Sequence, residues 1–179
     1  MGRLGWAVCV GLFLCGCNQQ SPTEMPSAPH VPDPVGTEVT FFVVGDTHFG
    51  QLGMSDANQK IIDAMNTLPG KRWPNAWGGT ISELFGVLIC GDMTEHGLPH
   101  EWSMFQDAYG TTGTEGKLRF ATYLVPGNHD RQPIDGKQRS ERRVALRHGV
   151  PYYSWNVQDV PFIALGIYPD AEALEQFTE

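Results

Sequence analysis

The pattern of apolar residues predicts an α/β fold with a parallel sheet. Short runs of β-prone residues alternate with segments whose apolar residues recur at helical spacing. Three of the runs stop at or just before a glycine, and residues with metal-binding side chains follow. Because parallel strands present their carboxyl ends at one edge of a sheet, the fold class also predicts where a functional site would lie.

The N-terminus has the pattern of a bacterial lipoprotein signal. Arg3 precedes an apolar run, Trp6–Leu14, which is too short to span a bilayer. The run leads into a Leu-Cys-Gly-Cys sequence at residues 14–17, which resembles the lipobox. We therefore expect a signal peptide over residues 1–16 and a lipid on Cys17, which would anchor the protein to a membrane of the bacterial cell envelope on its extracytoplasmic side. A plain secretory signal is the alternative.

A proline-rich stretch over residues 17–36 predicts an extended tether between this anchor and a folded domain. The remaining residues, 37–179, are expected to form one domain, because the chain is 41% hydrophobic and only 18% charged. The formal net charge of −8 disfavours nonspecific binding to nucleic acid. The oligomeric state stays open.

The domain is expected to contain strands and helices in alternation, followed by a hairpin. Strands are predicted where β-prone residues run together or alternate with polar ones, and helices where apolar residues share one face. Ser55 or Asp56 could cap the first helix, and Cys90, at the end of a strand, is expected to be buried. The strands are residues 38–44, 85–90, 119–125, 152–157 and 161–167, and the helical segments are residues 55–68, 99–109 and part of 131–148.

Polar segments follow three of these strands. They are Gly45-Asp46-Thr47-His48, Gly91-Asp92-Met93-Thr94-Glu95-His96-Gly97 and Gly127-Asn128-His129-Asp130. Their carboxylate, amide and imidazole groups form a mixed oxygen and nitrogen donor set, which suits Mn, Fe or Zn better than a pure oxygen site for Ca²⁺. A carboxylate held between two cations can bridge them, and two such ions, roughly 3.5–4 Å apart, could activate a shared water for in-line attack on phosphorus. The three segments together therefore predict a metal site, although each alone would be an ordinary turn.

The ordered set resembles the calcineurin-like metallophosphoesterases, whose pattern is Asp-x-His, then Gly-Asp, then Gly-Asn-His-Asp or Glu. The resemblance covers about residues 38–167. It implies a layered α/β/β/α sandwich, of which this chain holds the N-terminal part. It also implies a dinuclear site with two divalent metal ions, Mn, Fe or Zn, and hydrolysis of a phosphate monoester or diester.

The resemblance further implies a role for each residue of the set. The metal ligands would be Asp46 and His48 on the first ion, Asp92 between both ions, and Asn128 on the second. His129 would protonate the leaving oxygen or stabilise the charge of the transition state, and Asp130 would orient it. Thr94, Glu95 and His96 are expected to begin a helix or to support the ligands. His96 and His100 are expected to lie outside the metal site. The arginines at 131, 139, 142 and 143 are expected to form a solvated basic face, with contact to a substrate phosphate as the alternative.

The family pattern continues with two histidine motifs that do not occur here, one histidine on a later strand and a Gly-His-x-His segment. After Asp130 the sequence has a single histidine, His148. We therefore expect residues 37–179 to be a C-terminally incomplete phosphoesterase domain, and the activity of this chain alone stays open. The alternative is a non-catalytic, lipid-anchored binding lipoprotein that retains the fold.

Overall fold

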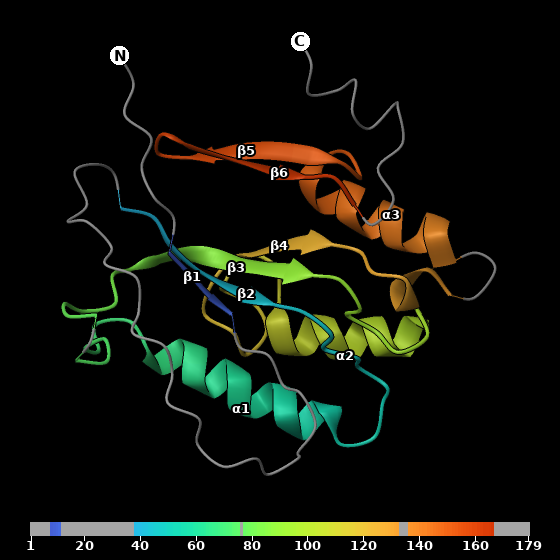
Figure 1. Cartoon of the computed structure of the whole chain (residues 1–179). Helices are drawn as coiled ribbons and strands as arrows, with labels where there is room; N and C mark the ends of the chain where they lie inside the picture. The colour runs from blue at the N-terminus through green and yellow to red at the C-terminus, as the bar shows by residue number, and fades with distance from the viewer. Residues whose placement is uncertain (1–7, 12–37, 76, 133–135, 167–179) are drawn as a thin grey trace, which may run out of the picture.

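The computed structural model describes residues 8–11, 38–75, 77–132 and 136–166 (Figure 1). The predicted tether, Cys17 and the C-terminal residues 167–179 lie outside these ranges. Of the predicted signal peptide, only residues 8–11 are described, as backbone.

The predicted α/β class is confirmed, because strands and helices alternate along the described chain. The elements are β1 (Val8–Gly11), β2 (Thr40–Val44), α1 (Met54–Thr67), β3 (Leu84–Cys90), α2 (Pro99–Tyr109), β4 (Thr122–Val125), the 3₁₀ helix η1 (His129–Arg131), α3 (Gly136–His148), β5 (Tyr153–Val157) and β6 (Val160–Ala164). The first sheet has the order β1-β2-β3-β4 with every neighbouring pair parallel, and β5 and β6 form a separate antiparallel hairpin.

The elements form layers. In Figure 1, α1 and α2 lie on one face of the parallel sheet, and the β5–β6 hairpin lies on the other. The helix-side layer is held together by buried apolar side chains. They include Phe42, Val44, Ile62, Met65, Val87, Ile89, Trp102, Phe105 and Leu124. Each fully buried side chain of this size stabilises the fold by about 1.5–3 kcal/mol, so this layer fixes how the helices sit on the sheet.

Aromatic side chains join the parallel sheet to the hairpin. Phe162 of β6 packs against Phe41 and Phe85, with ring centroids 5.4 and 5.1 Å apart. Tyr123 of β4 stacks on Trp155 of β5 at 4.5 Å. Such pairs add about 0.5–1.5 kcal/mol each to the apolar burial, so the hairpin is held firmly against the sheet.

Two local predictions at the element ends are wrong. The N-cap of α1 is Gly53, which has a left-handed φ of 83°, and not Ser55 or Asp56. Glycine adopts this conformation without steric cost, so it can begin the helix earlier than a side-chain cap would. Cys90 is exposed and not buried, because it is the last residue of β3 and lies where the strand leaves the core.

The edge strand β1 and the predicted signal peptide use the same residues. Val8–Gly11 pair in parallel register with residues 40–43 of β2. Removal of residues 1–16 would take β1 away and leave the hydrogen-bonding groups of β2 open at the edge of the sheet. None of the helices in the described ranges is both long enough and apolar enough to cross a lipid bilayer.

Helix α3 ends in a histidine that packs between strands. His148 stacks on Tyr153 of β5, with ring centroids 3.9 Å apart, and lies 6.0 Å from the ring of Tyr123 in β4. Burial, with a smaller effect of the neighbouring Arg147, lowers the pKa of His148 to about 4. The ring is therefore neutral in the folded protein at neutral pH.

We expect the fold to lose stability as His148 becomes protonated in the unfolded chain. An unfolded histidine has a pKa of about 6.5, so between that pH and about 4 the unfolded state binds a proton that the folded state does not. The free energy of unfolding should therefore fall with falling pH. In urea denaturation at about pH 7.5 and about pH 5, His148→Phe, which keeps the aromatic stack, should lose less stability than wild type. Equal losses in both proteins would contradict this assignment.

Candidate metal centre

The three polar segments meet because their strands are neighbours. β2 pairs with β3 and β3 with β4, all in parallel, so their carboxyl ends share one edge. Beyond β2 and β3 the backbones stay paired. The amide of Asp46 donates to the carbonyl of Gly91 at 3.2 Å, and the amide of His48 donates to that of Asp92 at 2.9 Å. The predicted meeting of the strand ends is thus observed.

Three of the predicted metal ligands have an unusual backbone. Asp46, His48 and Asp92 have φ values of 54°, 40° and 47°, and among the described non-glycine residues only Gln158 joins them in the positive range. In this left-handed region, the conformational energy of a residue with a side chain is higher by on the order of 1 kcal/mol or more. Such a conformation persists only where the surrounding structure enforces it. Strain of this kind is concentrated at functional sites, and here it falls on the residues that the sequence selects.

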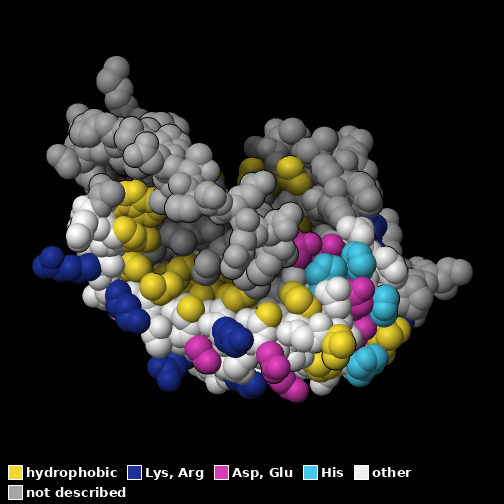
Figure 2. All heavy atoms as spheres, turned by 60° about the horizontal axis from the view of Figure 1, so that its bottom comes forward, with side chains coloured by type: hydrophobic (Ala, Val, Ile, Leu, Met, Phe, Trp, Pro, Cys, Tyr) yellow, Lys and Arg dark blue, Asp and Glu magenta, His cyan; other side chains and the backbone are white. Residues whose placement is uncertain are grey.

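Asp46, His48 and Asp92 form one cluster. Each offers a ligand atom, and these atoms all lie within 4.8 Å of one another. Oδ1 of Asp46 lies 3.6 Å from Nε2 of His48, and the Asp46 side chain is 75% exposed. Figure 2 shows acidic and histidine side chains gathered on one side of the molecule. The cluster is therefore open to solvent and to a ligand.

Glu95 belongs to the same site, although sequence analysis predicts no more than a supporting role for it. Its Oε2 lies 2.7 Å from Nδ1 of His48, and ligand atoms of His48, Glu95 and His129 form a second group within 4.8 Å. No helix starts at Glu95, because α2 begins at Pro99. The amide of Glu95 instead donates to the carbonyl of Phe49, which holds the residue beside His48. Its position three residues after Asp92 is the feature of the sequence that could have identified it as a site residue.

Two buried polar atoms at this contact lack a hydrogen-bond partner. They are Nδ1 of His48 and Oε2 of Glu95, whose short separation does not have the angles of a hydrogen bond. The carboxylates of Asp46 and Glu95 have only histidines as ion-pair partners within the described ranges. A cluster of carboxylate and imidazole groups, with ligand atoms that are not used in hydrogen bonds, fits a divalent metal ion such as Mn, Fe or Zn.

His129 is held by the loops around it. Its amide donates to Oδ1 of Asp92 at 2.9 Å, and its Nδ1 lies 2.7 Å from the carbonyl oxygen of Glu95. A carbonyl can only accept, so Nδ1 carries the proton and Nε2 is the atom that titrates. The Glu95 carbonyl, helped by the charges of Asp92, Glu95 and Asp130 and opposed by desolvation, raises the pKa of His129. The ring crosses that of His48 at a centroid distance of 4.7 Å.

Asp130 does not orient the His129 ring as the resemblance implies. Its fully buried carboxylate instead accepts hydrogen bonds from the amides of Met93, Thr94 and Gly127 at 2.8–3.1 Å and from the hydroxyl of Thr94 at 2.8 Å. Burial raises the pKa of Asp130, and these donors act against that shift. The carboxylate is directed at backbone amides because they converge on it from two loops, so Asp130 ties the loop after β3 to the loop after β4.

Asn128 lies between these groups along the chain but is exposed. It precedes η1, and its side chain makes no capping hydrogen bond. The glycine before it allows a close approach. A Cβ atom on Gly127 would lie 2.1 Å from Oδ1 of Asp92, so no larger residue fits there. The metal-binding role of Asn128 stays a prediction.

Buried polar residues support the loops from behind. Asn58 of α1 donates to the carbonyl of Thr47 at 2.7 Å and accepts from the hydroxyl of Tyr109 of α2 at 2.8 Å. Glu101, 2% exposed, accepts from the amides of His96 and Leu98 at 2.9 and 3.0 Å. Both helices thus fix the loops that carry His48 and Glu95. His96 and His100 are exposed and outside both ligand groups, as the sequence predicts.

The predicted basic face is wrong for three of its four arginines. Arg131 pairs with Glu141 at 3.4 Å, Arg139 donates to the carbonyl of Gly97 at 2.8 Å, and Arg143 lies over the ring of Trp102. Of the four, only Arg142 is exposed. Because α3 packs against η1 and α2, its arginines are used inside the fold.

Comparison with known families gives an independent result. A family model described as calcineurin-like phosphoesterase matches residues 39–173, which is most of the chain and includes all three polar segments. A search among curated proteins returns no match.

We expect Asp130→Asn to destabilise the fold by about 2–3 kcal/mol, because the amide group places donors against backbone donors and removes a charged acceptor. Asp46→Asn is the matched control. It keeps a residue type that tolerates positive φ and relieves repulsion, so it should change stability by no more than about 0.5 kcal/mol or increase it. Urea denaturation in the presence of a chelator measures both. Equal losses would contradict the structural role of Asp130.

We expect Glu95→Gln to weaken metal binding about tenfold, because His48 loses the carboxylate that orients its ring. Titration calorimetry with Mn²⁺ measures the affinity. Glu83→Gln, which removes an exposed carboxylate elsewhere, controls for net charge and should leave the affinity unchanged. Unchanged binding in Glu95→Gln would remove this residue from the site.

Proposed function

The chain belongs to the calcineurin-like phosphoesterase family, and we propose that it hydrolyses phosphate esters with two divalent metal ions. The observation that carries the proposal is the convergence of Asp46, His48 and Asp92, all with strained backbones, at one edge of the sheet. No requirement of the fold itself explains why two adjacent loops should hold these three residues in the left-handed region. Metal binding does explain it.

The metal ions would be held by Asp46 and His48 on one side and Asn128 on the other, with Asp92 between them. Bound there, they would supply Lewis acidity and an activated water at the phosphorus atom. The hydrogen bond from the His129 amide fixes the Asp92 carboxylate, and Glu95 holds the His48 ring. The exposed Asp46 leaves the centre open to a phosphate monoester or diester.

His129 is suited to act on the leaving oxygen. Its Nδ1 proton is held by the Glu95 carbonyl, so the proton that it exchanges is on Nε2. The hydrogen bond to the Glu95 carbonyl is the main cause that raises the pKa of His129, and it favours the imidazolium form. An imidazolium can donate this proton to the leaving alkoxide or stabilise the negative charge of the transition state. The side chain is 30% exposed, which allows a substrate to reach it.

We expect hydrolysis of a generic aryl phosphate in the presence of Mn²⁺, with loss of activity in EDTA and recovery on adding Mn²⁺. Asp92→Asn should lower kcat/KM by about a hundredfold or more, since the residue between the two ions loses its charge. Asp107→Asn, an exposed change on α2, is the matched control and should be fully active.

Two outcomes would overturn the proposal. Retained activity in Asp92→Asn would exclude the mechanism. A wild-type chain that is inactive and binds well under two Mn²⁺ ions by metal analysis would favour the non-catalytic alternative.

A further inference from the structure

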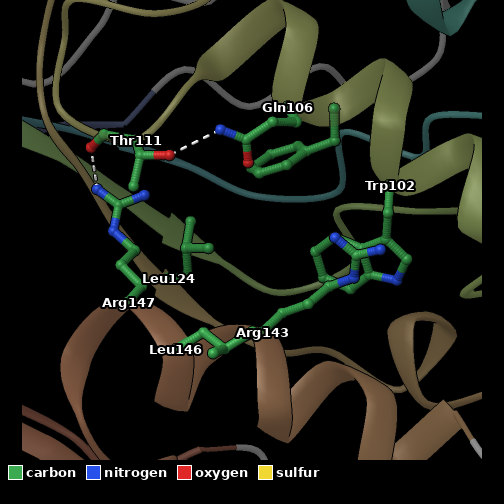
Figure 3. Close-up of a pocket in the computed structure, with 8 residues that line it drawn as sticks. Trp102, Gln106, Thr111, Leu124, Arg143, Leu146 and Arg147 are labelled. Atoms are coloured by element: carbon green, nitrogen blue, oxygen red, sulfur yellow. Dashed lines mark hydrogen bonds between the residues drawn. The ribbon is translucent and has the colours of Figure 1, made fainter.

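A cavity lies between α2 and α3, and its lining residues are distinct from those of the candidate metal centre. Its volume is about 240 Å³. Figure 3 shows side chains from α2, from β4 and from α3 directed into it. Its lining residues include Arg143 and Arg147, which lie one helical turn apart on α3.

Both arginines are held in place by neutral groups. Arg143 lies over the Trp102 ring, 4.9 Å from its centroid. Arg147 donates to the carbonyl of Thr111, and also to the hydroxyl of Thr122 at 2.6 Å. Within the described ranges, the ion pair that involves an arginine is the one between Arg131 and Glu141, so neither cavity arginine faces a carboxylate at ion-pair distance. The exposed carboxylate of Glu115 acts on Arg147 only from beyond ion-pair distance, so neither arginine of the cavity is neutralised by a direct ion pair.

Two donors at the cavity also lack an acceptor. Nε1 of Trp102 and Nε of Arg143 are both buried without a hydrogen-bond partner. The Trp102 residue is only 2% exposed. Native proteins leave few such groups unsatisfied, because each costs about 1–3 kcal/mol. An acceptor brought in by a ligand would satisfy them.

The charges persist at neutral pH. Burial lowers the pKa of Arg147 to about 10, and burial together with the charge of Arg139 lowers that of Arg143. Apolar side chains complete the wall, namely Phe105, Leu124 and Leu146. The cavity therefore combines fixed positive charge with an apolar surface.

We propose that this cavity binds the oxyanion group of a small organic molecule, a phosphonate, phosphate or carboxylate. A guanidinium presents its donors as a planar fork that matches two oxygens of such a group, and the apolar wall suits a short hydrocarbon body. The volume fits a molecule about the size of a single substituted ring, below the range of drug-sized ligands. The anion would neutralise the two arginines and accept from the unpartnered donors.

Titration calorimetry of the full chain with phenylphosphonate and with benzoate, both in EDTA, tests the proposal. EDTA removes binding through metal ions, and the two ligands distinguish phosphonate from carboxylate chemistry. At least one of them should bind. Leu146→Glu places a carboxylate at the exposed mouth of the cavity, where it would compete for the arginines, and should weaken binding about tenfold.

Matched variants separate this effect from others. Leu146→Gln has the same shape without the charge and should bind as wild type does. Arg142→Met removes an exposed positive charge from the same helix and should also bind as wild type does. Arg143→Met should weaken binding about tenfold, with circular dichroism confirming that it is folded. The proposal is wrong if neither ligand binds, or if Leu146→Glu and Leu146→Gln bind equally well.

Discussion

The buried carboxylate of Asp130 is the contact on which the rest of the site depends. It accepts hydrogen bonds from two of the three loops that carry the candidate site residues, through Met93 and Thr94 after β3 and Gly127 after β4. A charge in the interior is tolerated only when donors satisfy it, and here the backbone supplies most of them. Because the two loops are joined at this point, Asp92 and His129 lie within one hydrogen bond of each other.

The residues of the candidate metal centre lower the stability of the fold. The carboxylates of the centre repel one another, three of its residues have strained backbones, and the buried contact between Nδ1 of His48 and Oε2 of Glu95 lacks the angles of a hydrogen bond. Well-packed surroundings compensate for these costs. Asn58, Tyr109 and Glu101 connect the loops to both helices, and the aromatic layer holds the hairpin on the opposite face. A bound cation would remove the repulsion, which is why the same arrangement favours metal binding.

Much of the fold could be predicted from local sequence. The bounds of α2 match, and β2, β3, β5 and β6 lie within a few residues of their predicted ranges, because apolar periodicity reflects which face is buried. The element ends were less predictable. Gly53 caps α1 through its backbone conformation, which leaves no side-chain signal, and Cys90 is exposed because of where the strand leaves the core.

The chemical groups that gather at the sheet edge can be predicted without the structure, because each follows a strand and parallel strands end together. Asp46, His48 and Asp92 could be named in this way. The contacts of Glu95 and Asp130 depend on how the loops pack in three dimensions. Glu95 contacts His48, and Asp130 accepts hydrogen bonds from backbone amides. In both cases the partner groups come from segments that are far apart in the sequence. Arginines of α3 were likewise expected to be solvated. The packing of α3 against α2 instead places Arg143 and Arg147 at a cavity.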